Sequence, residues 1–160
     1  MKHEISAGGI VFKKLKIQPR FNRGQISNVK TDIVWLICQH SQHKGWVFPK
    51  GLVGDNEKDE ALEIAALREV DEEGGIKARL INPLTKPVSY YYTFQGQKIK
   101  KTVYYFLMEY ISGDPKNHDF EMLDAKFVSE DDVRKTLTYL VDKEAFEEAL
   151  KLFGKTEGGR

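Results

Sequence analysis

Acidic side chains recur at helical spacing in the middle of the chain. In the segment GDNEKDEALEIAALREVDEEGGI, Glu69, Glu72 and Glu73 are related by i, i+3 and i+4, so on a helix they lie within an arc of roughly 100°. Like charges at this spacing repel each other and destabilise a helix. One interpretation is a solvated acidic face. The other is a cluster of oxygen ligands for Mg²⁺ or Mn²⁺, because these ions bind carboxylates and keep waters that a phosphate can displace.

Three neighbouring features favour the metal-binding interpretation. The pair Gly74-Gly75 follows the acids at once, Arg68 directly precedes them, and a lone Glu60 lies eight residues before Arg68. Carboxylates next to a tight loop and a fixed cation are typical of a site that binds a divalent ion and a phosphate. The chemistry of the chain is therefore expected to come from carboxylates.

The elements that position these residues can be predicted from the same sequence. Residues 59–73 contain no Gly or Pro and are rich in Ala, Leu and Glu, which predicts a helix that Gly74-Gly75 ends by supplying a positive φ. Residues 33–38, IVWLIC, predict a central strand buried on both faces. The remaining expectations are a first strand over 5–14 with a bend or bulge at Gly8-Gly9, a surface loop or long hairpin connection over 16–31, an ordered loop over 46–54, strands near 77–94 and 98–110 joined by a turn at Gly96, a short strand over 125–128, a helix starting at Ser129, and a closing helix over 142–153.

Composition narrows the class of protein. The chain has 160 residues with 25 Lys and Arg against 24 Asp and Glu, a net charge of +1, which predicts one domain over 1–160 with a frayed tail near 154–160. This balance gives no general reason to bind nucleic acid or an anionic membrane. No apolar run approaches the roughly 20 residues of a membrane helix, the N-terminus lacks the apolar stretch of a secretory signal, and Cys38 is the single cysteine. We expect a cytoplasmic location.

The segment from Gly54 to Ile76 resembles the Nudix box, G-x5-E-x7-R-E-U-x-E-E-x-G-U, where U is a bulky aliphatic residue. Every fixed position is matched, by Gly54, Glu60, Arg68, Glu69, Val70, Glu72, Glu73, Gly75 and Ile76. The resemblance implies an α/β fold, the Nudix-type α/β/α sandwich with a mixed central β-sheet. In the phrase WVFPKG the glycine is Gly51, three residues before Gly54. Either Gly54 is the box glycine or the loop carries an insertion, and either Glu57 or Glu60 meets Arg68.

The resemblance also implies roles for individual residues. Glu69, Glu72 and Glu73 would hold Mg²⁺ or Mn²⁺, aided by a carbonyl near Gly51, and Lys50 would contact phosphate. Glu60 and Arg68 would form an ion pair that orients the ligand helix. For Arg68 the alternative is an ordinary i,i+4 partner of Glu72, and for Lys50 it is an ordinary loop lysine.

Glu121 is a separate candidate, because in similar enzymes a glutamate ahead of the next strand acts as base or as an extra metal ligand. Asp119 and Asp124 are neighbouring acids that compete with it for this role. A plain surface acid is the alternative for Glu121.

The substrate side of the site is expected on the strands after the box. A tyrosine at this distance resembles the diadenosine polyphosphate hydrolases, in which an aromatic ring stacks on the base, and Tyr90 and Tyr92 are the candidates. Lys101, with Lys98 and Lys100, could meet a polyphosphate. The alternatives are core tyrosines and a sheet edge guarded by lysines. His40 and His43 are expected to be solvent-exposed or to touch phosphate.

The family resemblance therefore implies a Mg²⁺-dependent pyrophosphohydrolase that cleaves a nucleoside diphosphate linked to another group, with a bis(5′-nucleosyl)-tetraphosphatase-like specificity. Alternatives are a hydrolase of nucleoside triphosphates or damaged nucleotides, a diphosphoinositol polyphosphate hydrolase, and a non-catalytic nucleotide sensor. The expected partner is a small-molecule nucleotide. The sequence leaves the scissile bond, the number of metal ions and the oligomeric state open.

Overall fold

The computed structural model describes residues 1–17, 21–22, 25–26, 30–54 and 59–158. Its elements in chain order are β1 (Lys2–Ile17), β2 (Phe21–Asn22), β3 (Gln25–Ile26), β4 (Lys30–His40), β5 (Trp46–Val47), β6 (Lys50–Leu52), α1 (Leu62–Gly74), β7 (Ile76–Pro83), β8 (Val88–Phe94), β9 (Gln97–Gly113), η1 (Pro115–Asn117), β10 (Met122–Val128), α2 (Glu130–Thr136), α3 (Leu140–Phe153) and η2 (Gly154–Gly158).

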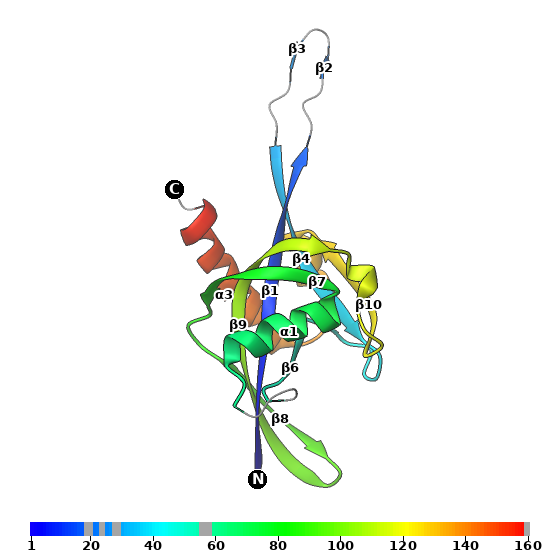
Figure 1. Cartoon of the computed structure of the whole chain (residues 1–160), viewed down its shortest axis with the longest axis vertical. Helices are drawn as coiled ribbons and strands as arrows, with labels where there is room; N and C mark the ends of the chain where they lie inside the picture. The colour runs from blue at the N-terminus through cyan, green and yellow to red at the C-terminus, as the bar shows by residue number, and fades with distance from the viewer. Residues whose placement is uncertain (18–20, 23–24, 27–29, 55–58, 159–160) are drawn as a thin grey trace.

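Eight strands of the described chain form one mixed sheet. The strand order is β10-β4-β1-β9-β7, and β5, β6 and β8 extend it by pairing with β4, β1 and β9 respectively. Strand β1 runs through the middle of the molecule (Figure 1). It pairs parallel with β9 on one side and antiparallel with β4 and β6. The predicted mixed sheet is confirmed.

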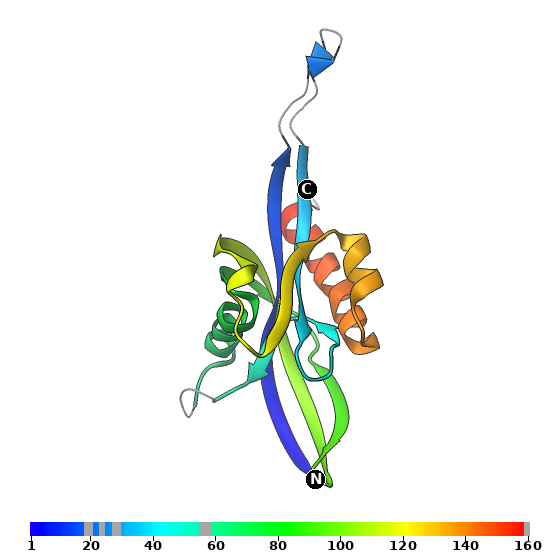
Figure 2. The ribbon, with the colours of Figure 1, turned by 90° about the vertical axis from the view of Figure 1, so that its right-hand side faces the viewer.

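Helices cover both faces of this sheet. Figure 2 shows α1 on one face and the pair α2 and α3 on the other. Each face has its own core: Ala65, Ala66 and Val70 of α1 pack in one cluster, and Phe146 and Ala149 of α3 pack in the other. The predicted α/β/α sandwich is therefore confirmed. Among the described residues, no helix has both the length and the apolar character needed to span a membrane.

Strand β4 connects the two cores. Its buried side chains alternate, with Trp35 and Ile37 in the cluster under α3 and Leu36 and Cys38 in the cluster under α1. This alternation follows from the two-residue period of a strand. The predicted central strand over 33–38, buried on both faces, is confirmed.

The predicted bend or bulge at Gly8-Gly9 is wrong. Pairing between β1 and β9 runs without a register shift from Lys2 to Phe12. The glycines serve close approach instead: a Cβ at Gly8 would lie 2.3 Å from the Pro49 carbonyl oxygen, and one at Gly9 would lie 2.6 Å from Cγ2 of Val70. Glycine at these positions lets the chain before β6 and helix α1 pack directly on β1.

Several element boundaries differ from the prediction. The strand expected over 77–94 is two strands, β7 and β8, separated by residues 84–87. Both strands pair with the continuous strand β9, so the break interrupts only the chain that runs beside β9. Helix α1 begins at Leu62 and not near Asp59, whose φ of 69° is left-handed. The expected loop over 46–54 contains the short strands β5 and β6, because its backbone pairs with β4 and β1.

Other local expectations are confirmed. Helix α1 closes on Gly75 with φ 73°, and the turn at Gly96 has φ 76°. Ser129 accepts a hydrogen bond from the Asp132 N–H at the start of α2. Strands β1 and β4 pair antiparallel as far as Ile17 and Lys30, while 18–20, 23–24 and 27–29 of the expected loop or hairpin connection lie outside the described residues. A π-helical turn over Gly154–Gly158 follows α3.

Candidate active site

A cavity of about 860 Å³ brings together residues from both sides of the sheet. Its acidic wall consists of Glu69, Glu72 and Glu73 of α1 with Glu121, which precedes β10. The other predicted site residues on its lining are Lys50, Gly51, Tyr90, Tyr92 and Lys101. Residues far apart in the sequence thus share one space.

Glu69 and Glu73 lie beside the apolar stripe of α1, because Glu69 follows Ala65 and Glu73 follows Val70 at helical spacing. Ala65, Ala66 and Val70 are fully buried against the sheet, and the small alanines permit close packing. Glu69 and Glu73 are only 4% and 5% exposed, while the side chain of Glu72 is 45% exposed. Two of the three carboxylates are therefore held largely out of water.

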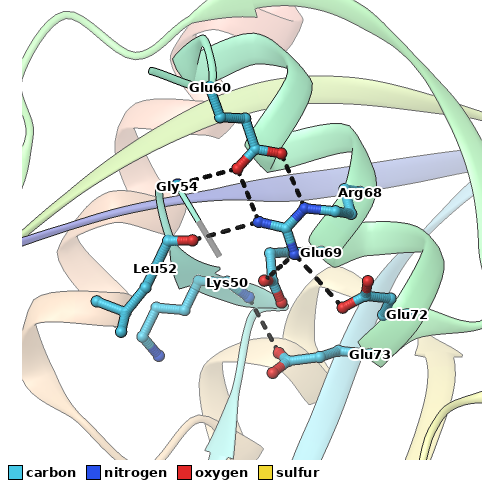
Figure 3. A network of polar contacts seen from close by, with 8 residues as sticks. All are labelled: Lys50, Leu52, Gly54, Glu60, Arg68, Glu69, Glu72 and Glu73. Atoms are coloured by element: carbon cyan, nitrogen blue, oxygen red, sulfur yellow. Dashed lines mark hydrogen bonds and ion pairs between the residues drawn. The ribbon is translucent and has the colours of Figure 1, made fainter. Parts of the chain in front are cut away.

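Arg68 ties α1 to the segment that precedes it. Its Nε and Nη2 atoms donate to the two carboxylate oxygens of Glu60 at 2.9 and 3.0 Å, and Nη2 also donates to the Leu52 carbonyl at 3.2 Å (Figure 3). The contact with Glu72, at 3.5 Å, is longer. Arg68 is therefore chiefly the partner of Glu60, and Glu57 lies outside the described residues.

Gly51 and Gly54 perform different tasks. Gly54 has φ 92°, a left-handed conformation that favours glycine, and its N–H donates to Glu60 Oε1 at 3.0 Å. A Cβ on Gly51 would lie 2.2 Å from the carboxyl carbon of Glu69. Gly54 thus shapes the turn that receives Glu60, and Gly51 makes room for the Glu69 carboxylate.

The acidic wall carries unfavourable charge. Burial, with a contribution from Glu69, raises the pKa of Glu73 to about 9, although the Lys50 N–H donates to Glu73 Oε1 at 3.1 Å. Arg68 Nη1 donates to Glu69 Oε1 at 2.6 Å. Within the described part of the chain, no three Asp, Glu, His or Cys side chains converge into a ready metal cluster. The hard oxygen donors nevertheless match the preference of Mg²⁺ and Mn²⁺.

An aromatic and basic wall lies on β8 and β9. The ring centroids of Tyr90 and Tyr92 are 6.3 Å apart, on the same face of β8. The Tyr92 hydroxyl donates to Glu4, and Lys101 Nζ lies 3.8 Å from the same carboxylate and 5.7 Å from the Tyr92 ring centroid. Burial raises the pKa of Tyr92 to about 12, so this ring stays neutral.

Two of the candidate lysines lie elsewhere. Lys98 and Lys100 place their Nζ atoms 4.9 and 6.0 Å from the ring centroid of Tyr91, on the opposite face of the strands from Tyr90 and Tyr92. Strand alternation explains the separation. Lys98 and Lys100 therefore do not line the cavity that Lys101 lines.

Glu121 is an exposed acid on the cavity lining. Its N–H donates to Asp119 Oδ1 at 3.1 Å, and its carbonyl accepts from the Ser41 N–H at 2.9 Å. These bonds fix the backbone while the carboxylate stays at the surface. Asp119 and Asp124 do not line the cavity, so Glu121 is the acid of this segment that the fold places there.

The pair His40 and His43 forms part of the rim. Their rings stack with centroids 4.3 Å apart and an interplanar angle of 6°, and both line the cavity. Burial is the main cause that lowers the pKa of each ring. Neutral stacked imidazoles can offer hydrogen bonds but no permanent positive charge to phosphate.

Sequence reasoning missed Tyr139, Asp142 and Glu4. Asp142 is 4% exposed and lines the cavity. A signal existed, because Asp142 shares a helical stripe with the apolar Ala145, Phe146 and Ala149, where an acid is out of place. Glu4 gave no such signal, since only the pairing of β1 with β9 brings it beside Lys101.

Known proteins share this sequence pattern and fold. A model of the NUDIX domain matches residues 24–149. A Mycobacterium tuberculosis (strain CDC 1551 / Oshkosh) protein provisionally named mutator protein MutT4 is 27% identical over 158 residues, covering 97% of this chain and 58% of the relative. Nudix hydrolase 4 of Arabidopsis thaliana is 29% identical over 134 residues, covering 83% and 62%. The chain thus spans about three fifths of the length of these relatives.

A solved structure extends the comparison to the fold. The crystal structure of a C. elegans Ap4A hydrolase binary complex superposes with a TM-score of 0.68 at 22% identity, covering 95% of this chain and 98% of that one. The match of the family model over residues 24–149 includes the whole box on α1. The chain therefore belongs to the NUDIX domain family.

Proposed function

We propose that this chain is a metal-dependent pyrophosphohydrolase that cleaves a nucleoside diphosphate linked to another group, with a dinucleoside tetraphosphate as its preferred substrate. The observation that carries the proposal is the single cavity joining the acidic wall of α1 to Tyr90, Tyr92 and Lys101. Acids for a cation, a lysine for phosphate and rings for a base are the three contacts such a substrate needs. The likeness of fold to the C. elegans Ap4A hydrolase supports this choice.

The acidic wall would hold the cation. Glu69, Glu72 and Glu73, with a backbone carbonyl near Gly51, would supply oxygen ligands to Mg²⁺, or to Mn²⁺. When bound, such an ion neutralises charge on the phosphates and lowers the pKa of a water. Arg68 orients Glu69 through their 2.6 Å hydrogen bond, and its bridge to Glu60 holds the helix in place. An outer partner of this kind can matter 10- to 100-fold without touching substrate.

Other residues act on the substrate itself. Lys101 and Lys50 line the cavity and would contact the polyphosphate, where positive charge is needed. Glu121 would accept the proton of the attacking water, because it is an exposed carboxylate on the same lining. The proton then leaves the water as its oxygen bonds to phosphorus, and a nucleoside phosphate departs. Tyr90 and Tyr92 would stack on a base.

A substrate panel tests the proposal. The wild-type chain is assayed on diadenosine tetraphosphate, nucleoside triphosphates, nucleotide sugars and a diphosphoinositol polyphosphate, with Mg²⁺, Mn²⁺ or EDTA, and the products are identified by mass. We expect turnover that requires a divalent ion and is highest for diadenosine tetraphosphate. Equal turnover in EDTA would contradict the metal-dependent mechanism. Binding of nucleotides without any turnover would instead identify a non-catalytic sensor.

A second candidate is a hydrolase of nucleoside triphosphates, including damaged ones. The observation that favours it is the 27% identity with the relative provisionally named mutator protein MutT4. The same panel separates the two, since a pool-cleaning enzyme would have a higher kcat/KM for a modified triphosphate than for diadenosine tetraphosphate.

A further inference from the structure

One buried acid of the cavity takes no part in the proposed metal site. Asp142 lies in the first turn of α3, is 4% exposed and lines the cavity. Helix α3 covers the face of the sheet opposite α1 (Figure 2), so Asp142 stands on a different wall from Glu69 and Glu73. A carboxyl group in this position needs a reason, because burying it without full hydrogen bonding costs stability.

The protein satisfies this carboxyl group only in part. The hydroxyl of Tyr105, itself buried, donates to Asp142 Oδ1 at 3.3 Å. In the part of the chain that the structure describes, Tyr105 is the one residue that donates a hydrogen bond to this side chain. The second oxygen, Oδ2, therefore remains an acceptor available to a group that enters the cavity.

The surroundings of Asp142 are largely apolar, which suits a nucleobase. The three residues before it in the chain, Tyr139, Leu140 and Val141, also line the cavity and are aromatic or aliphatic, while the positive charge of Lys50 acts on the Asp142 carboxyl group. The Asp142 carboxyl group also contributes, after burial, to the raised pKa of Tyr90, which places it close to one of the candidate stacking rings. A carboxylate would repel phosphate, but it accepts hydrogen bonds from the edge of a stacked base.

We propose that Asp142 determines base specificity by accepting a hydrogen bond from an exocyclic amino group, so that the cavity prefers adenine to hypoxanthine. This inference rests on the proposed function in one respect, that the substrate carries a nucleobase. Tyr105 is the positioning residue, because its hydroxyl fixes one carboxyl oxygen and leaves the other toward the base. The phosphates would then lie near the cation held by the acidic wall of α1, on the other side of the cavity.

AMP and IMP provide the test, because they differ by an amino against an oxo group at one ring position. We expect calorimetry to show wild type binding AMP about tenfold more tightly than IMP, since a hydrogen bond to a charged group has about this effect on affinity. Asp142→Asn keeps an oxygen for Tyr105 and turns an amide NH₂ toward the cavity, so it should reverse the preference. Asp142→Ala should bring the two affinities to equality. Glu144→Gln, at an exposed acid of the same helix, should leave the wild-type ratio unchanged.

Several results would overturn the inference. They are an unchanged AMP-to-IMP ratio in Asp142→Ala, an equal weakening of both nucleotides, and no binding of either nucleotide to wild type. Failure of the proposed function looks different. If the chain prefers AMP as described but does not hydrolyse diadenosine tetraphosphate with Mg²⁺, the role of Asp142 stands and the enzymatic proposal fails. If the chain hydrolyses diadenosine and diinosine tetraphosphates at equal rates, the enzymatic proposal stands and the role of Asp142 fails.

Discussion

Glu69 is held in place from two sides. Arg68 donates to its carboxylate at 2.6 Å, and Gly51 leaves the space that the carboxylate occupies. A side chain at residue 51 would have to displace Glu69, because a Cβ there would lie 2.2 Å from its carboxyl carbon. The lack of a side chain at Gly51, in β6, is therefore a requirement of the proposed metal site.

Gly51→Ala should lower the affinity for Mg²⁺ and leave the fold intact. The methyl group would shift Glu69, so we expect the Mg²⁺ concentration for half-maximal turnover to rise about tenfold or more. The matched control is Gly154→Ala, where a Cβ meets nothing within 4 Å and the backbone is right-handed helical. An unchanged Mg²⁺ dependence in the Gly51 variant would remove Glu69 from the ligand set.

Glu121→Gln tests the proposed base. A general base contributes about 10²–10⁴-fold to rate, so kcat should fall by that factor with little change in KM. Asp124→Asn is the matched control, because Asp124 is an exposed acid of the same segment that does not line the cavity. A loss below about threefold for Glu121→Gln would make Glu121 a surface residue and direct attention to the acids of α1.

Single residues differ in how far the sequence predicts them. Glu69, Glu72 and Glu73 could be predicted because one local rule, the helical period, sets their common face. Asp142 could not be assigned to the cavity, nor Glu4 to a place beside Lys101, since their positions depend on α3 packing on the sheet and on β1 pairing with β9. Local spacing carries information about neighbours along the chain, and a cavity built from several elements needs the tertiary fold.

At the scale of elements, two ion pairs of the same form can be compared. Arg68 contacts Glu60, and Arg134 contacts Glu147, each through two guanidinium nitrogens and both carboxylate oxygens. The side chains of the first pair are 13% and 4% exposed and those of the second 41% and 50%. The first pair joins α1 to the segment before it, and the second joins α2 to α3.

Glu60→Gln should cost far more than Glu147→Gln. Glu60→Gln removes the charge partner of two guanidinium nitrogens, although Arg68 keeps its contact with Glu69, so we expect a loss of about 1.5–3 kcal/mol. The loosened helix should also reduce turnover about 10- to 100-fold. Glu147→Gln should cause little change in thermal unfolding, because the exposed pair is solvated and screened. Thermal melts and kcat on the same preparations provide the measurement, and equal effects of the two substitutions would contradict an anchoring role for Glu60.

Strand β8 allows a second comparison, between adjacent tyrosines. If Tyr92 stacks on a base, Tyr92→Ala should raise KM for diadenosine tetraphosphate by a factor that corresponds to about 1–3 kcal/mol, with little effect on a base-free polyphosphate. Tyr91 also lines the cavity, but its ring lies against Lys98 and Lys100, so Tyr91→Ala should raise this KM less than Tyr92→Ala. A fall in melting temperature with equal loss on both substrates would identify Tyr92 as a structural residue.

The elements themselves were predicted unevenly, for physical reasons. Helix α1, β4 and the Ser129 cap follow strong local rules and were found. The break between β7 and β8 was missed, because two strands that pair with the same partner form one continuous apolar-polar pattern. The Gly8-Gly9 pair was misread as a bulge, since a glycine needed for close packing and one needed for backbone conformation look alike in a sequence.

At the scale of the whole molecule, the cavity connects two layers that otherwise have separate cores. Because Glu69 and Glu73 are buried and their negative charges repel each other, a bound cation should stabilise the folded chain. At a hundredfold excess over its Kd, Mg²⁺ should add about 2.7 kcal/mol, or about 5–10 °C in Tm for a chain of this size. Glu73→Gln should lose most of this shift, whereas Glu63→Gln, an exposed acid on the same helix, should retain it. An equal shift in both variants would place the cation elsewhere.

The pairing of β1 with β9 has a consequence for how the chain is made. Lys2 lies opposite Ile99 in the parallel register, so during synthesis β1 cannot pair with β9 until nearly a hundred further residues have followed. Contacts so distant in sequence slow folding. Until β9 arrives, the nascent chain carries a long strand with one bare edge, which is open to wrong partners.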